Sequence, residues 1–146
     1  MKFSLLALAA ASVAIFACRT PSPPPAPAGV AELQLPGDSR SLARIAADEN
    51  PTGSVARRRE VLGQVARQLA MDPPADAHVP EMFDLLAVMA PRVEARTISP
   101  AWASYVYTSY QRELVRERPG GMPRRSADEV TRALDGYVEF FRLRGR

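Results

Sequence analysis

The chain has 146 residues, which is enough for one domain of modest size. Charged residues make up 24% of it and hydrophobic residues 47%, a balance typical of globular proteins and not of disordered ones. A net charge of only +3 does not suggest a protein that binds nucleic acid or another polyanion.

The first segment, residues 1–17, has the composition of an export signal. Lys2 supplies a positive charge, and an uncharged apolar run from Phe3 to Ala17 follows it. This run is shorter than the ~20 residues that a permanent membrane-spanning helix needs, and Arg19 and several prolines end it abruptly. We therefore predict a signal peptide over residues 1–17, and an uncleaved membrane anchor is the alternative.

The only cysteine, Cys18, lies where this apolar run meets a proline tract. Ile15-Phe16-Ala17-Cys18 resembles the lipobox of bacterial lipoproteins, although Phe16 stands where small residues are commoner. The resemblance implies a diacylglyceryl thioether on Cys18, cleavage before it, and acylation of the new amino group with a fatty acid such as palmitate. The alternative is an ordinary cleavage site at Ser12-Val13-Ala14. That site would leave Cys18 as an unpaired thiol, which in an exported protein needs an explanation.

The lipobox resemblance also implies a location. Three acyl chains anchor a protein stably, whereas a single chain binds a membrane only marginally. In enterobacterial lipoproteins an aspartate after the cysteine favours retention in the inner membrane, and this chain has Arg19 there. The expected location is the cell envelope, with the outer membrane favoured over the inner membrane.

Residues 18–38 are predicted to be the lipidated cysteine and a proline-rich linker. Five prolines lie within nine residues and favour a polyproline II conformation, in which residues 20–28 would reach about 28 Å. The segment suits a spacer that holds a domain clear of lipid headgroups, and the alternative is a proline-rich ligand for another protein. The sequence VAELQLPG at residues 30–37 receives no assignment.

The remaining residues, 39–146, are predicted to form an all-α domain, a compact bundle of four or five helices. Proline and glycine separate the apolar periodic segments, and no alternation typical of strands competes with the helical pattern. The expected helices cover residues 40–49, 55–71, 79–95, 100–118 and a last segment that follows Ser126 and ends at Gly145.

Serine and proline residues mark the ends of these helices. We expect Ser54 and Ser99 to cap the second and fourth helices, and Ser126 with Glu129 to form the capping box of the fifth. Pro51 is expected to end the first helix. Pro91 is expected to kink the third helix or to end it near Ala90, and Pro80 suits its first turn.

The fourth expected helix carries a group of aromatic residues that suggests a partner surface. Tyrosine and tryptophan are common at protein interfaces because they offer a large apolar area and one polar group. The alternative is that the rings cover a small core and their hydroxyl groups reach water. The residues of this candidate surface are Trp102, Tyr105, Tyr107 and Tyr110.

The sequence contains no pattern of a reactive centre. His78 is the only histidine and has no cysteine near it in sequence, so neither a metal site nor a cofactor is predicted. Glu113 and Glu129 lie among arginines and suggest exposed ion pairs instead of catalytic carboxylates. We therefore expect no enzyme.

The expected function is a non-enzymatic envelope lipoprotein whose domain binds a protein, such as an accessory or assembly factor of a secretion, motility or envelope complex. Phage-type lysis lipoproteins of the spanin kind also place a proline-rich stretch after the lipidated cysteine, and they are the alternative. An envelope hydrolase is a second and less favoured alternative.

Overall fold

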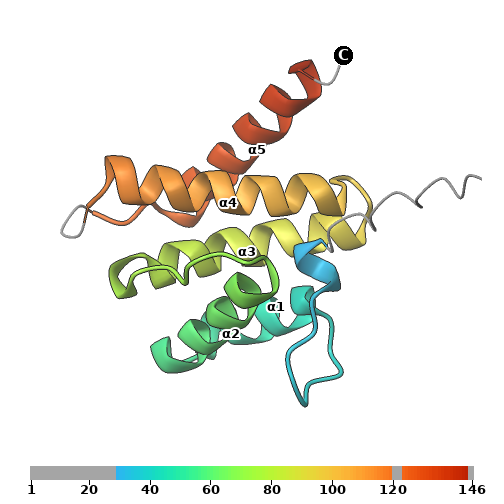
Figure 1. Cartoon of the computed structure of the whole chain (residues 1–146), viewed down its shortest axis with the longest axis vertical. Coiled ribbons are helices and arrows are strands. Elements are labelled where there is room, and N and C mark those ends of the chain that lie inside the picture. Colours follow the sequence, from blue (N-terminus) through green and yellow to red (C-terminus); the bar gives the residue numbers. More distant parts are fainter. Residues whose placement is uncertain (1–28, 120–122, 145–146) are drawn as a thin grey trace, which may run out of the picture.

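The computed structural model describes residues 29–119 and 123–144, and every regular element within them is helical (Figure 1). The predicted all-α bundle is therefore confirmed. Cys18, the signal peptide and Gly145 lie outside the described residues. The elements are the 3-10 helices η1 (Val30–Glu32) and η2 (Asp76–His78) and the α-helices α1 (Leu42–Thr52), α2 (Val55–Gln68), α3 (Val79–Glu94), α4 (Pro100–Glu117) and α5 (Ala127–Arg144).

Helix α3 is the centre of the bundle. It packs against each of the other α-helices and against both 3-10 helices. In Figure 1, α1 and α2 lie on one side of it, and α4 lies on the other, with α5 crossing α4 obliquely. Because neighbours surround it, α3 buries residues around nearly its whole circumference, including Phe83, Leu86 and Met89, each fully buried.

The packed part of the chain begins earlier than the sequence suggests. The predicted linker ends at residue 38, but Val30, Leu33 and Leu35 belong to the hydrophobic core. η1 contacts α1, α3 and α4, so residues 29–38 are part of the folded domain. The apolar residues of this segment are few and too irregularly spaced to show a helical or strand period, and residues 30–37 could therefore not be assigned from sequence.

The predicted caps at Ser54, Ser99 and Ser126 are confirmed, whereas α1 begins at Leu42, two residues after its predicted start. The hydroxyl groups of Ser54 and Ser99 accept hydrogen bonds from the backbone N–H of the third residue after each of them. Before α5, the Glu129 carboxylate accepts the backbone N–H of Ser126 at 2.7 Å, and the N–H of Glu129 points back to the Ser126 hydroxyl. This hydrogen bond lowers the pKa of Glu129, because it favours the charged carboxylate.

The predicted end of the first helix before Pro51 is wrong, and so is an end of the third helix near Ala90. α1 continues through Pro51 to Thr52, and α3 continues past Pro91 to Glu94. Each proline lies in the last turn of its helix, so its ring and missing N–H disturb few hydrogen bonds. Beyond Pro91, burial of Val93 holds the last turn of α3 against the core.

Two helices end in a left-handed cap that contains no glycine. α2 and α3 are each followed by a left-handed residue, Ala70 with φ of 52° and Arg96 with φ of 59°. The backbone N–H groups of Met71 and Thr97 donate to the carbonyls of Ala66 and Arg92, closing the same hydrogen-bonded cap at both ends. Α2 therefore ends at Gln68, three residues before the predicted end.

Candidate functional site

Exposed apolar side chains gather on α4 and α5. Five large hydrophobic residues are exposed within the described part of the chain, and four of them lie on these two helices. Val115 is near the C-terminal end of α4, and the other three lie near the C-terminal half of α5. Tyr105 is 57% exposed, Phe140 46% and Leu143 64%. Apolar side chains that gather in this way are more informative than single exposed ones, because they mark interaction sites.

The rings on these helices are packed around Phe141. Its ring centroid lies 4.4 Å from that of Tyr105 and 6.2 Å from that of Trp102, both edge to face. The ring of Phe140 lies 5.3 Å away in the same kind of geometry. These separations are the preferred ones for aromatic pairs. We call Trp102, Tyr105, Phe140, Phe141 and Leu143 the aromatic surface.

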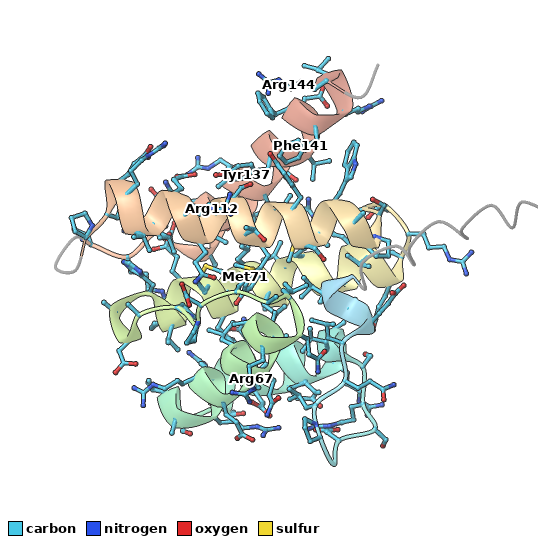
Figure 2. The ribbon with its side chains drawn as sticks, in the orientation of Figure 1. Arg67, Met71, Arg112, Tyr137, Phe141 and Arg144 are labelled. Carbon is cyan, nitrogen blue, oxygen red and sulfur yellow. The ribbon has the colours of Figure 1, made fainter. Side chains whose placement is uncertain are left out.

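The path of α5 explains why these residues are accessible. In its first half, Val130 and Leu134 are fully buried against the core. Figures 1 and 2 show the second half extending past α4, with Phe141 and Arg144 near the projecting end. There the helix has a neighbour on one side only, so Phe141 is partly covered by α4 while Phe140 and Leu143 face outward.

A buried carboxylate fixes the start of α5. Glu81 of α3 is 4% exposed and accepts hydrogen bonds from Arg118 at 2.8 Å to each oxygen and from the Tyr110 hydroxyl at 2.6 Å. It also accepts the backbone N–H of Arg125 at 3.2 Å. We call Glu81, Tyr110, Arg118 and Arg125 the Glu81 cluster. It joins both ends of the α4–α5 connection to α3.

The electrostatics of this cluster follow from burial. Tyr110 is fully covered, and burial followed by the hydrogen bond to Glu81 raises the pKa of its hydroxyl. Nearby, Arg124 pairs with the buried carboxylate of Asp84. His78 donates from Nε2 to the carbonyl oxygen of Arg118 at 2.9 Å, which caps the end of α4. The histidine thus has a structural contact, and none of the described carboxylates pairs with it.

A second carboxylate links α4 directly to α5. Glu113 accepts hydrogen bonds from the Tyr137 hydroxyl and from Arg125. Burial alone would raise the pKa of Glu113, but these two donors favour its charged form and the net pKa is lowered. The Tyr137 ring in turn stacks near Phe141, with centroids 6.3 Å apart. The carboxylate therefore helps to orient the helix that carries the aromatic surface.

The predicted partner surface needs a correction. Trp102 is partly exposed and Tyr105 is exposed, and both contact Phe141. Tyr107 and Tyr110 are fully buried, so they do not belong to an accessible surface. Tyr107 faces the core, and Tyr110 faces Glu81 beneath α5.

Phe140, Phe141 and Leu143 are the part of this surface that sequence reasoning missed. Phe141 fits the apolar face of the fifth predicted helix, together with Val138. The adjacent Phe140 lies off that face and is exposed. The sequence signal for this surface was therefore Phe140, an aromatic residue that lies outside the apolar stripe of an amphipathic helix.

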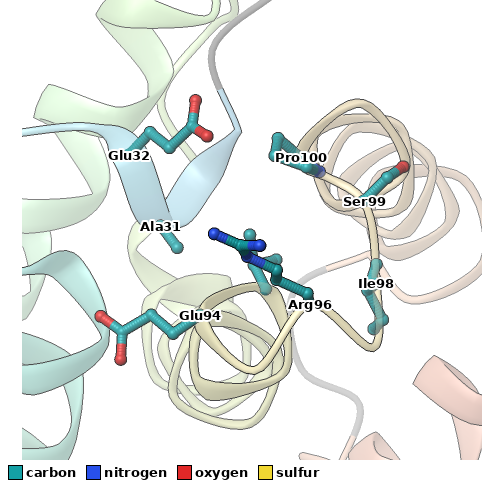
Figure 3. Close-up of a pocket in the computed structure, with 8 residues that line it drawn as sticks. Ala31, Glu32, Glu94, Arg96, Ile98, Ser99 and Pro100 are labelled. Carbon is teal, nitrogen blue, oxygen red and sulfur yellow. The ribbon is translucent and has the colours of Figure 1, made fainter.

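A separate hollow of about 510 Å³ lies beside η1 and the α3–α4 turn (Figure 3). Its lining mixes small apolar groups with Glu32, Glu94 and Arg96. Figure 3 shows Arg96 extending toward Ala31, with Pro100 and Ser99 at the start of α4 opposite. Among the described residues no three histidine, cysteine or acidic side chains gather in a way that could hold a metal ion.

The comparisons with known proteins add no relationship. No family model matches this sequence, and no curated protein or solved structure is significantly similar to it. Within residues 29–119 and 123–144, none of the helices has the length and hydrophobicity needed to cross a lipid bilayer.

Proposed function

We propose that this protein is a lipid-anchored protein of the bacterial envelope whose helical domain binds another protein through the aromatic surface. The observation that carries the proposal is the cluster of Trp102, Tyr105, Phe140 and Phe141 on α4 and α5. Two of these residues are exposed although the chain has a well-packed core elsewhere. Aromatic residues of this kind supply most of the binding energy at many interfaces.

The charges around the surface indicate what the partner presents. The Arg144 guanidinium lies over the Phe140 ring, 4.5 Å from its centroid, and forms no ion pair with the described residues. Arg142 is exposed one residue after Phe141 and pairs weakly with Glu139 at 3.6 Å. A protein surface with apolar side chains bordered by carboxylates would complement this arrangement. The proposed role of this surface is therefore protein binding.

The anchor part of the proposal is supported by the lipobox-like sequence at Cys18. By the same resemblance, Arg19 in place of an aspartate after the cysteine favours the outer membrane. In this proposal the proline-rich linker holds the domain away from the lipid headgroups. Intact mass measurement of the exported protein and of Cys18→Ser tests this part. A mass increment of lipid size that the variant loses supports the anchor, and an unmodified Cys18 contradicts it.

The binding part is tested by photo-crosslinking in the native host. A crosslinking amino acid placed at Tyr105 or at Phe140 should give the same discrete adduct at both positions. Val55 on α2 is the matched control, because it is 53% exposed and apolar but distant from the aromatic surface in sequence and on another helix. Adducts at Val55 equal to those at Tyr105, or none at either aromatic position, would refute the proposed interface.

A further inference from the structure

A second hollow lies between α4 and the loop that connects α2 to η2. Its volume is about 620 Å³, which is in the usual range for ligand sites. One wall is α4, whose contributing residues recur at the spacing of a single helix side, and the loop forms the other wall. The α4 wall consists of Thr108, Gln111, Arg112, Val115 and Arg116, and the loop wall of Ala70, Met71, Asp72, Pro73 and Ala75. We call this site the loop–α4 hollow.

Two contacts hold the loop against the helix, so the hollow is preformed. The side chain of Gln111 donates from Nε2 to the carbonyl oxygen of Asp72 at 2.7 Å. The hydroxyl oxygen of Thr108 lies 3.2 Å from the sulfur of Met71. Met71 and Arg112, both labelled in Figure 2, belong to opposite walls. A site whose walls are already fixed loses little conformational freedom when a ligand binds.

The hollow contains a buried acceptor that the described residues leave unpaired. Gln111 is only 8% exposed, and its Oε1 accepts no hydrogen bond from them. Turning the amide round does not solve this, because Nε2 would then lose the carbonyl oxygen of Asp72. A buried carbonyl oxygen without a donor costs free energy. An N–H group of a ligand in the hollow would supply the missing donor.

The α4 wall also carries positive charge that is free to bind an anion. Arg112 is exposed and forms neither an ion pair nor a hydrogen bond with the described residues. Arg116 pairs with its neighbour Glu117, but both side chains are exposed and such pairs contribute little. Two guanidinium groups one helical turn apart suit a carboxylate. Asp72 is exposed on the loop wall and would repel that carboxylate, which therefore belongs on the α4 wall.

The apolar part and the length of the hollow complete its description. Val115 lies between the two arginines in sequence and is 61% exposed. From Thr108 to Arg116 the wall extends over eight residues, about 12 Å along the helix axis. An extended peptide advances about 3.3 Å per residue, so three or four residues match this length. A backbone N–H, a carboxylate and an apolar side chain within that length are the features of an acidic peptide segment.

We propose that the loop–α4 hollow binds an extended acidic peptide segment of another protein. Gln111 Oε1 accepts a backbone N–H of the segment. Arg112 and Arg116 hold the side-chain carboxylate of an aspartate or glutamate, and Val115 contacts the apolar residue beside it. The hollow contains no residue of the aromatic surface, so this inference goes beyond the proposed function and does not rest on it.

NMR titration of the full chain tests this site. The ¹⁵N-labelled protein, purified in a non-ionic detergent, is titrated with the probe peptide acetyl-Leu-Asp-Leu-amide. The side-chain amide signal of Gln111 should shift saturably, while that of Gln64, which is on α2 and does not line the hollow, should stay in place. Acetyl-Leu-Asn-Leu-amide has nearly the same shape without the charge, and its dissociation constant should be roughly 3- to 5-fold higher.

A pair of arginine variants tests the role of the charge. Arg112→Gln should raise the dissociation constant of the aspartate peptide roughly 3- to 5-fold, the effect expected for one exposed ion pair. This variant should fold normally, because Arg112 is exposed and holds no other described residue. Arg132→Gln on α5 is the matched control, since Arg132 is also exposed but does not line the hollow. Its affinity for the peptide should equal that of the wild type.

Four outcomes would overturn the proposal. The first is that no saturable shift appears at Gln111. The second is equal affinity for the aspartate and asparagine peptides, which would exclude recognition of the carboxylate. The third is that sodium acetate alone reproduces the shift at Gln111, which would indicate attraction of any small anion. The fourth is a shift of the Trp102 indole signal in place of Gln111, which would assign the peptide to the aromatic surface. None of these results depends on crosslinking at Tyr105 or Phe140, so the two proposals fail separately.

Discussion

Helix α3 and the second half of α5 are both rich in apolar residues, but the two helices differ in how far these side chains are buried. α3 has helices on both sides and fully buries Phe83, Leu85 and Leu86 within about one turn. α5 has a neighbour on one side and leaves Phe140 and Leu143 exposed. The free energy of apolar burial thus holds α3 in place, while α5 depends more on polar contacts at its start. A helix held in this way can carry exposed rings without losing its position.

The largest expected effect comes from removing the charge that holds the α4–α5 connection. Glu81→Gln leaves the guanidinium of Arg118 without its carboxylate in a nearly dry site. Breaking such a pair from one side costs about 3–5 kcal/mol. Chemical denaturation of the purified protein would measure this loss in the free energy of unfolding.

The control for Glu81→Gln is Glu139→Gln on the outer face of α5. Glu139 pairs with Arg142, and both side chains are more than half exposed. Removing this pair should change the free energy of unfolding by less than about 1 kcal/mol. If the two variants were equally stable, α5 would be held by apolar packing alone and the contrast with α3 would disappear.

A smaller effect is expected from removing one hydroxyl. Tyr110→Phe removes the 2.6 Å hydrogen bond to Glu81 and should cost about 1.5–3 kcal/mol, the usual range for a bond to a charged group. Tyr105→Phe, on the exposed surface of the same helix, should leave thermal stability unchanged. Thermal unfolding followed by circular dichroism compares the two, and an equal loss of stability in both would place Tyr105 in the packed structure.

The smallest effect concerns pH. Because the pKa of Glu113 is lowered below its ordinary value of 4.5, the stability that its contacts with Tyr137 and Arg125 provide is complete above pH 4.5. It is lost as the pH falls through the lowered pKa of the folded protein. The difference in melting temperature between the wild type and Glu113→Gln should therefore shrink as the pH is taken below 4.5. A difference that stays constant down to pH 3 would show that Glu113 does not orient α5 through its charge.

The helix starts were predictable because their causes are local. Ser54, Ser99 and Ser126 act within three residues of their own positions, so the sequence alone contains both partners of each cap. The helix ends expected at Pro51 and near Ala90 were wrong because a proline in the last turn of a helix costs little, and the sequence does not show how far packing extends a helix.

The surface was only partly predictable because it depends on the other helices. Spacing along α4 shows which tyrosines share a side, but the position of α5 decides that Tyr110 is covered and Tyr105 is not. The partnership of Glu81 with Arg118 joins residues 37 positions apart, and no local pattern indicates it. The core role of Leu33 and Leu35 likewise depends on contacts with distant helices.

Gly29 is buried against Pro100 at the start of α4, and this contact has a mechanical meaning. Any pull on the chain upstream of Gly29 enters the domain through η1, which is wedged among α1, α3 and α4. The force is thus distributed over three helices and does not act on a single terminal helix alone. Val30, fully buried directly after the glycine, is the first side chain that such a force must extract. A domain attached in this way opposes traction from its N-terminal side through core packing and not through one terminal helix alone.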